Sequence, residues 1–435
     1  MPESQAVSLT SERWKTALAS LAFFLLLCSY YVLRPLRDSM AVFTGPERVP
    51  WLFTGTFLAT LAVVPLFGWF VRWCPRRWLV PCVYGLVIAG FGGFYVLFQS
   101  GINTVSASAF FIWLSLFNMV IISLFWSTVS DTFSTGQAQR CYGFIAAGGT
   151  AGAIAGPIIT AAFAKSVDTS QFIFVSMGLL VLALLSLLFL SRQPSHGGGA
   201  SARPIGGSIF AGITHTFQSP LLAGIAGLVM CYSAVSTVLY LEITDLVGKT
   251  YTENGDRTAF FARIDLAVNL SALTLQLFLT RIMLARWGLR WTLCLVPILM
   301  LIGLGIVGIA PTIAFYALAQ VIHRAGEFSF SKPGREILFT TVDAENRYKA
   351  KNFIDTAVYR ANDAGSAWII ALIRSVGWSA IWWVAIPVTV IWIGLCSVVG
   401  SRRNGSQHQE DETDTREMDS VHLSGSATVS SVRIG

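Results

Sequence analysis

The sequence predicts an all-α membrane protein with twelve transmembrane helices in two bundles of six. Hydrophobic residues make up 54% of the 435 residues and charged residues only 12%, whereas about a quarter of the residues of a soluble domain are charged. Apolar runs recur along the whole chain, and each can supply the roughly 20 helical residues that cross a bilayer. Helices are the expected elements because lipid offers the backbone no other hydrogen-bond partners.

The apolar runs and the loops between them predict the topology. We expect spans at residues 16–36, 51–71, 78–98, 107–130, 141–164, 171–190, 221–247, 259–281, 291–309, 312–331, 352–375 and 378–399. We count 18 lysines and arginines in the loops on the side of the N-terminus and six on the other side. Because basic loops remain in the cytoplasm, we expect a multi-pass protein of a cell (inner) membrane with both termini cytoplasmic.

A stretch rich in glycine, serine and proline, Ser191–Ser208, separates the sixth and seventh spans. This composition is typical of a flexible linker. Residues 401–435 are polar and poor in aromatic residues, which predicts disorder. The predicted parts are a cytoplasmic N-terminus (1–15), an N-terminal bundle (16–190), a cytoplasmic linker (191–220), a C-terminal bundle (221–400) and a disordered cytoplasmic tail (401–435).

Several classes of function are disfavoured by the residues present. The seven cysteines stand singly, without CxxC or Cys/His spacing, so we expect no metal site and no disulfide framework. Only His323 of the five histidines falls in a span, and no catalytic constellation is visible, so we expect no enzyme and no cofactor. Basic loops explain the net charge of +7 without nucleic acid binding. A channel-type pore loop is missing, and a monomer is one of the oligomeric states that the sequence allows.

Ionisable residues inside the spans are the most informative feature, because each costs at least about 2.5 kcal/mol at the bilayer centre. The third, sixth, ninth and twelfth spans contain no acidic or basic residue. We expect the charged spans to border a route for a small polar or anionic solute. Candidate solute-binding residues on them are Arg34, Arg37, Asp38, Glu242, Asp245, Arg324, Glu327, Asp355 and Arg360. The alternative is that opposite charges neutralise each other and hold the helices together.

Arginine is the most informative of these residue types, because its planar guanidinium donates two parallel hydrogen bonds to a carboxylate or phosphate and stays protonated.

Glycines mark a second feature. The fifth span contains GFIAAGGTAGAIAGP, which places Gly148, Gly152 and Gly156 on one helical face before Pro157. Small residues let helices approach closely, so we expect these four residues to pack at the interface between the halves. Their order also resembles the antiporter motif of major facilitator exchangers, which implies exchange or export.

The stretch YYVLRPLRDSMAV (Tyr30–Val42) resembles the first-helix motif of the ATP/ADP translocase family, nucleotide exchangers of the major facilitator type. FFARIDLAVN (Phe260–Asn269) and KAKNFID (Lys349–Asp355) are similar to the same family, in the same order. The resemblance implies a major facilitator-type fold of six plus six helices and exchange of nucleotides. It also implies a substrate route lined by Arg34, Arg37, Asp38, Glu242, Lys351 and Asp355.

Two features depart from that family, and one of them is the lack of a glutamate early in the fourth span, near Trp113 and Leu114. The nucleotide exchangers of the family also tend to carry Gly-Lys-Ser-Gly in the eleventh span, where this chain has Ala361–Gly365 with Asp363 among them. The reversed charge is unfavourable for a triphosphate. Our first hypothesis is a secondary active transporter that moves a small polar or anionic solute by alternating access, with ATP/ADP-type exchange. The alternative is a major facilitator-type exporter or proton-coupled carrier of a non-nucleotide solute.

Overall fold

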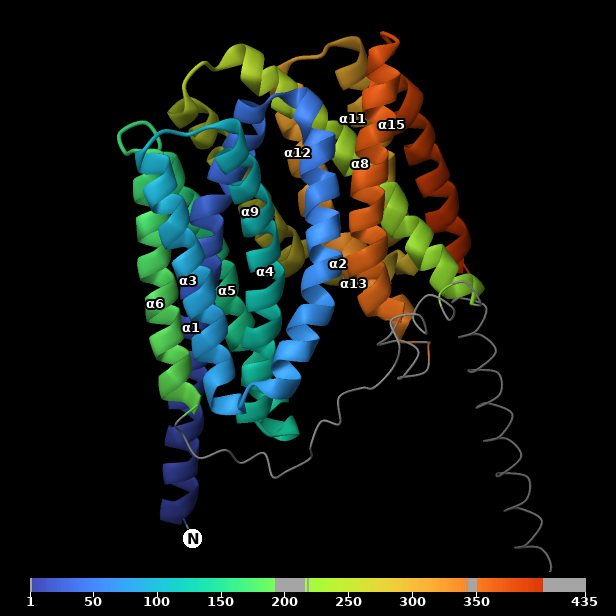
Figure 1. Ribbon diagram of the computed structural model, residues 1–435. Coiled ribbons are helices and arrows are strands. Elements are labelled where there is room, and N and C mark those ends of the chain that lie inside the picture. The colour runs from blue at the N-terminus through green and yellow to red at the C-terminus, as the bar shows by residue number, and fades with distance from the viewer. Residues whose placement is uncertain (1, 192–215, 217–218, 341, 343–349, 402–435) are drawn as a thin grey trace, which may run out of the picture.

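The computed structural model describes residues 2–191, 216, 219–340, 342 and 350–401, and these are almost entirely helical (Figure 1). The predicted linker (191–220) and the predicted disordered tail (401–435) lie almost wholly outside the described residues.

Six long helices form the N-terminal half. They are α1 (Pro2–Thr44), α2 (Val49–Trp73), α3 (Arg76–Gln99), α4 (Thr104–Thr132), α5 (Thr135–Phe163) and α6 (Thr169–Ser191), with the short 3-10 turn η1 (Pro46–Arg48) before α2. Local signals fix the ends of these helices. Before α4, for example, Asn103 and Ser106 exchange backbone-to-side-chain hydrogen bonds of 2.9 and 3.1 Å, which satisfies two amide groups at the helix start. Gly45 adopts φ +92° at the end of α1, a conformation that favours glycine.

The C-terminal half repeats this up-and-down pattern, but four of its helices contain a π-helical segment. Two continuous helices are α8 (Pro220–Thr250) and α11 (Gly288–Ile309). The segmented ones are α9 (Asn254–Leu275) with η2 (Gln276–Thr280) and α10 (Arg281–Arg286); α12 (Ile313–Gly326) with η3 (Glu327–Ser331) and α13 (Lys332–Phe339); η4 (Phe353–Val358) with α15 (Tyr359–Ser375); and η5 (Ile381–Ala385), whose helix continues to Ser401.

Each of the twelve predicted spans overlaps one of these helices, so the predicted helix count is confirmed for the described part of the chain. Ten of the helices there are long and apolar enough to cross a membrane. The other two are α12 with its continuation and η4 with α15, whose polar and charged residues lower their hydropathy. Those residues form much of the site described below.

Each half has its own hydrophobic core, built around its first helix. Leu26 and Leu33 of α1 are about 1% exposed or less and pack in the core of the N-terminal half. Val235 and Val238 of α8 are fully buried in the core of the C-terminal half. The core of the C-terminal half also includes Val42 and Leu52 of the N-terminal half, so the two cores meet where the halves touch.

The third, sixth, ninth and twelfth predicted spans, which contain no charged residue, lie on the surface. Phe174 and Phe189 of α6 and Ile302 of α11 are more than half exposed, as are Ile391 and Val398 of the last helix. Large apolar side chains gathered on an outer surface mark contact with a membrane. This is the arrangement expected if α3, α6, α11 and the last helix face lipid.

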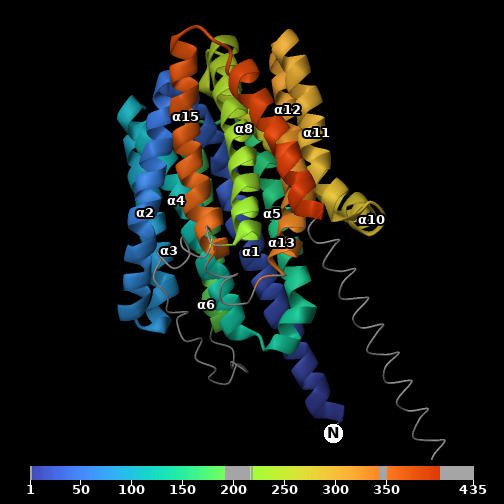
Figure 2. The ribbon, with the colours of Figure 1, turned by 90° about the vertical axis from the view of Figure 1, so that its right-hand side faces the viewer.

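The two halves contact each other near the end of the bundle opposite the N-terminus, which is uppermost in Figures 1 and 2. There Trp368 of α15 donates a hydrogen bond of 3.0 Å to Thr54 of α2. Lys165 and Asp256, which also belong to different halves, form an ion pair of 2.6 Å. These contacts hold the halves together at that end.

The glycine stripe of α5 lies elsewhere than predicted. A Cβ atom on Gly148, Gly152 or Gly156 would come within 3 Å of Ser20, Phe24 or Tyr31 of α1. The stripe therefore packs inside the N-terminal half, and the prediction that it lies at the interface between the halves is wrong. Small residues cover more than one face of α5. On a different face, the carbonyl oxygen of Ala153 accepts a hydrogen bond from the side chain of Asn269 of α9. Pro157 is buried within α5.

Candidate functional site

Two arginines from opposite halves converge on one buried carboxylate. Arg34 of α1 lies 3.5 Å from Oδ1 of Asp265 on α9, and Arg324 of α12 lies 2.7 Å from the same oxygen. The Asp265 side chain is 1% exposed and that of Arg324 is 8% exposed. Oδ2 of Asp265 and Nε of Arg34 are buried and have no hydrogen-bond partner among the described residues. The cluster thus joins the halves and retains unused hydrogen-bonding groups.

A second polar contact between the halves lies one turn farther along α1. Arg37 binds Asp38 with an Nη2 to Oδ1 distance of 2.7 Å, and Tyr240 of α8 donates a hydrogen bond of 3.2 Å to the same Asp38 oxygen. The guanidinium of Arg37 also lies 4.9 Å from the centre of the Phe111 ring. Asp38 is 4% exposed. The candidate residues Arg34, Arg37 and Asp38 therefore lie on the part of α1 that faces the C-terminal half.

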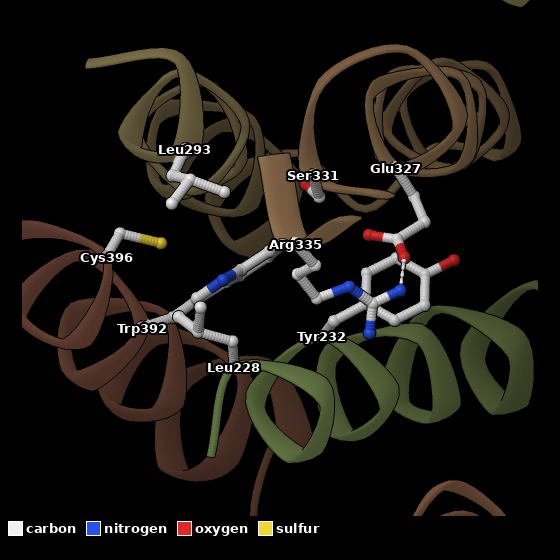
Figure 3. Close-up of a pocket in the computed structure, with 8 residues that line it drawn as sticks. All are labelled: Leu228, Tyr232, Leu293, Glu327, Ser331, Arg335, Trp392 and Cys396. Atoms are coloured by element: carbon white, nitrogen blue, oxygen red, sulfur yellow. Dashed lines mark hydrogen bonds and ion pairs between the residues drawn. The ribbon is translucent and has the colours of Figure 1, made fainter. Parts of the chain in front are cut away.

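A third cluster lies within the C-terminal half, around Arg335 of α13. Its Nη2 lies 2.6 Å from Oε1 of Glu327 in η3, and its Nη1 lies 3.8 Å from Oδ1 of Asp355 in η4. Figure 3 shows the Glu327 and Arg335 pair beside Ser331, with Tyr232 and Trp392 nearby. Both acidic partners sit in π-helical segments, which are frequent at functional sites.

Arg335 was missed by the sequence prediction, which placed it in a loop after the tenth span. The helix instead continues through η3 and α13 to Phe339 and carries Arg335 into the bundle. The apolar pattern ends before this residue, so hydropathy gave no signal for it. Its spacing from Glu327, eight residues and about two helical turns, could have suggested the pair.

Asp363 is bound between α15 and α8. Ser233 and Thr237 of α8 both donate hydrogen bonds to its Oδ1, and Arg360 lies 3.8 Å from its Oδ2. Asp363 is 8% exposed and Ser233 is fully buried. The aspartate that departs from the translocase pattern is therefore an inward-facing, hydrogen-bonded residue.

The other predicted residues lie apart from these clusters. Glu242 forms a 2.8 Å ion pair with Arg374 and accepts a 3.4 Å hydrogen bond from Tyr316. With Asp245 it lines a pocket of about 480 Å³ near the end opposite the N-terminus. Asp245 itself binds Lys249 at 2.6 Å. The structure thus separates Glu242 and Asp245 from the arginines of the first cluster.

Lys351 lies in yet another place, toward the opposite end of the C-terminal half. Its Nζ is 2.6 Å from Glu336 of α13, and both side chains are more than a third exposed. Of the ten candidate residues, the structure brings Arg34 and Arg324 together through Asp265, and Glu327 and Asp355 together through Arg335. Asp265 and Arg335 are the connecting residues that the candidate list lacked.

The first cluster can bind an anion in a way that involves both halves. Arg34 and Arg324 bring two positive charges to one negative charge, so an incoming carboxylate or phosphate can replace Asp265 as their partner. Asp265 also keeps the arginines from being buried unpaired, which is costly. This arrangement suits reversible binding of an anion, without any chemical reaction.

Comparison with known proteins identifies the family. Residues 19–262 match the family described as Major Facilitator Superfamily, which is more than half of the chain. The chain belongs to the Major Facilitator Superfamily. It is therefore a multi-pass membrane transporter and not an enzyme, and the predicted major facilitator-type fold is confirmed.

Two curated relatives carry the translocase resemblance. The chain is 22% identical to ADP,ATP carrier protein 2 of Chlamydia pneumoniae over 87% of both chains. It is 23% identical to ADP,ATP carrier protein 2 of Chlamydia trachomatis serovar D over 80% of this chain and 79% of that one. The predicted relationship to the ATP/ADP translocase family is thereby confirmed as a distant one.

Solved structures agree on the fold. The nucleoside transporter NupG superposes with a TM-score of 0.62 and 14% identity, covering 89% of this chain and 98% of that one. A bacterial homologue of the iron transporter ferroportin, in an inward-facing state, gives a TM-score of 0.60 and 15% identity, covering 90% and 99%. At such identities the likeness concerns the fold alone.

Proposed function

We propose that this transporter is a secondary active exchanger that carries anionic solutes of the nucleotide class by alternating access of its two halves. The observation that carries the proposal is the convergence of Arg34 and Arg324, from opposite halves, on the buried Asp265. Through these two arginines a single anion could contact both halves. Arg37 and Arg360 lie on the same two halves and would add positive charge around a phosphate chain.

Asp265 explains how an anion would change the contact between the halves. In the described state Asp265 is the shared partner of both arginines and so connects α1 to α9 and α12. A solute phosphate that binds either arginine competes with Asp265 and weakens that connection. A ligand shifts a conformational equilibrium only through different affinities for its states, and this competition supplies such a difference.

The contacts between the halves support alternating access. Lys165 with Asp256 and Thr54 with Trp368 close the end of the bundle opposite the N-terminus. If both termini are cytoplasmic, as the basic loops indicate, the described state is closed to the outside and corresponds to an inward-facing one. The printed names of the two curated relatives, ADP,ATP carrier proteins, support nucleotides as the solute class.

One observation favours a second candidate, a carrier of a non-nucleotide anion that exports its solute or couples to protons. Arg360 lies 3.8 Å from the carboxylate of Asp363, so part of its charge is already balanced. Less positive charge is then available for a triphosphate than for a singly or doubly charged solute. Competition of labelled ATP uptake by carboxylates and sugar phosphates would separate the two candidates.

The test is exchange in proteoliposomes loaded with ADP, measured as uptake of labelled ATP. We expect saturable uptake that falls at least about tenfold in Arg34→Ala, because one buried arginine to phosphate contact contributes more than a factor of ten. Arg140→Gln is the matched control, since Arg140 also forms an ion pair, with Glu12 at 3.0 Å, but its side chain is 64% exposed. Absence of exchange with every nucleotide tested, in correctly folded protein, would refute the nucleotide proposal and leave the family unchanged.

A further inference from the structure

The bonds around Asp363 gather oxygen atoms at one buried point between α8 and α15. Ser233 and Thr237 are 0% and 1% exposed, and they lie one helical turn apart on α8 with both hydroxyl groups directed at the Asp363 carboxylate. The adjacent Asn362 donates a hydrogen bond of 2.9 Å to the carbonyl of Met230, which fixes α15 against α8 at this level. The three oxygen-bearing side chains are therefore held in place by their helices.

The charge of Asp363 is loosely balanced. Arg360 is 3.8 Å away, beyond hydrogen-bonding distance, and its side chain is 31% exposed. The positive charge of Arg37 also attracts the Asp363 carboxylate, but Arg37 forms its own ion pair with Asp38 at 2.7 Å. An ionised carboxylate in a membrane interior is costly without a closely bound cation. Arg360 therefore balances the charge of Asp363 only in part.

We propose that Asp363, Ser233 and Thr237 form a binding site for a sodium ion, and that this ion binds together with the anionic solute. Carboxylate and hydroxyl oxygens are the ligands that hard cations prefer. A single carboxylate balances one positive charge, so a divalent ion would leave an excess charge next to Arg360. A monovalent ion matches the site, and its binding requires no covalent step.

The coupling to the solute rests on the proposed function, because it requires an anion that binds Arg360. When Arg360 turns to that anion, Asp363 loses its present counter-charge and its affinity for sodium rises. Because such coupling is reciprocal, sodium must raise the affinity for the anion by the same factor. The sodium site and the solute site would then fill together, and the sodium gradient could drive uptake.

The first experiment measures sodium binding without any solute, so its result does not depend on the nucleotide proposal. The unfolding temperature of the purified protein is compared in sodium chloride and in choline chloride at equal ionic strength. We expect sodium to raise it by about 2 °C or more, since a bound ligand stabilises the folded state. The increase should vanish in Asp363→Asn and shrink in Thr237→Val. Asp245→Asn, which removes an exposed ion pair with Lys249, should retain it.

The second experiment measures the affinity for ADP in the two salts. We expect sodium to tighten ADP binding at least about fivefold in the wild type and to have no effect in Asp363→Asn. If sodium raised the unfolding temperature equally in the wild type, Asp363→Asn and Thr237→Val, the proposed site would be overturned. So would an unfolding temperature that responds to acid and not to sodium, which would indicate protonation of the carboxylate.

Two further results are also decisive. If Asp363→Asn does not fold, Ser233→Ala and Thr237→Val keep the carboxylate and still test the site, because an unchanged sodium shift in both variants contradicts it. A sodium shift without any change in ADP affinity supports the cation site and overturns its coupling to the solute.

Discussion

Arg34 and Arg324 belong to different halves of the molecule, yet both lie within 3.5 Å of the same oxygen of Asp265. Asp265 is far from both arginines in the sequence, and its side chain is 1% exposed. Two guanidinium groups gathered around one carboxylate would repel each other without it. The stability of this arrangement therefore depends on the single negative charge of Asp265.

Replacing Asp265 by asparagine tests this dependence, because the amide keeps the shape and removes the charge. We expect Asp265→Asn to lower the free energy of unfolding by about 3 to 5 kcal/mol, the usual effect of removing one partner of a buried ion pair. Asp256→Asn breaks a half-exposed pair with Lys165 and should cost less than about 1 kcal/mol. Thermal unfolding in detergent compares them. Equal stability of the two variants would show that the negative charge of Asp265 is not needed to hold the two arginines together.

The two acidic partners of Arg335 should differ in importance. Glu327 lies 2.6 Å from Arg335 with a side chain 7% exposed, whereas Asp355 lies 3.8 Å away and is 39% exposed. We expect Glu327→Gln to cost about 3 kcal/mol of stability and Asp355→Asn less than about 1 kcal/mol, because solvent screens the more exposed charge. Unfolding temperatures of the two variants and of Arg335→Gln provide the measurement. A larger loss in Asp355→Asn than in Glu327→Gln would contradict this ranking.

The close contact of α5 with α1 predicts a contrast between two glycines on one helix. A Cβ atom on Gly152 would lie 2.2 Å from the carbonyl oxygen of Phe24, whereas one on Gly143 would meet nothing within 4 Å. We expect Gly152→Ala to force the helices apart and destabilise the protein by about 1 to 3 kcal/mol. Gly143→Ala should be neutral or stabilising by up to about 1 kcal/mol, since alanine is the better helix former. The unfolding temperature should fall in Gly152→Ala and should not fall in Gly143→Ala, and a neutral Gly152→Ala would disprove the tight contact.

The helices of this fold could be predicted from sequence because the signal is local. Ten of the described helices stand out as long apolar runs, and the charges inside the spans stand out against that background. Arg34 and Arg324 were therefore recognisable as unusual residues before their surroundings were known. Hydropathy alone was sufficient for these features, since lipid imposes the same requirement on every span.

The partners of these residues could not be predicted, because pairing is a property of the packed bundle. Glu242 and Arg34 both stand out as charges in apolar spans, but Glu242 binds Arg374 near one end of the bundle. The helical spacing of Gly152 showed that it lies on a packed face, without showing that the neighbour would be α1. Arg335 was overlooked because the apolar run stops before the helix does.

Alternating access predicts that locking the closed end stops transport. A Cβ atom on Gly248 of α8 would lie 3.3 Å from Cγ1 of Val42 on α1, so cysteines at these two positions would be close enough to be joined by a disulfide. In a background without the seven native cysteines, we expect oxidised Val42→Cys with Gly248→Cys to lose uptake at least about tenfold, since the halves can no longer separate there. Reduction with dithiothreitol should restore it.

A second cysteine pair distinguishes this lock from general damage. Gly224 and Val399 are in contact within the C-terminal half, where a Cβ atom on Gly224 would lie 2.7 Å from Cγ2 of Val399. A disulfide between Gly224→Cys and Val399→Cys joins two helices of the same half, so it should leave uptake largely unchanged if that half moves as one body. Uptake that survives the Val42 and Gly248 crosslink, with the disulfide shown on a gel, would mean that the contact of α1 with α8 does not open during transport.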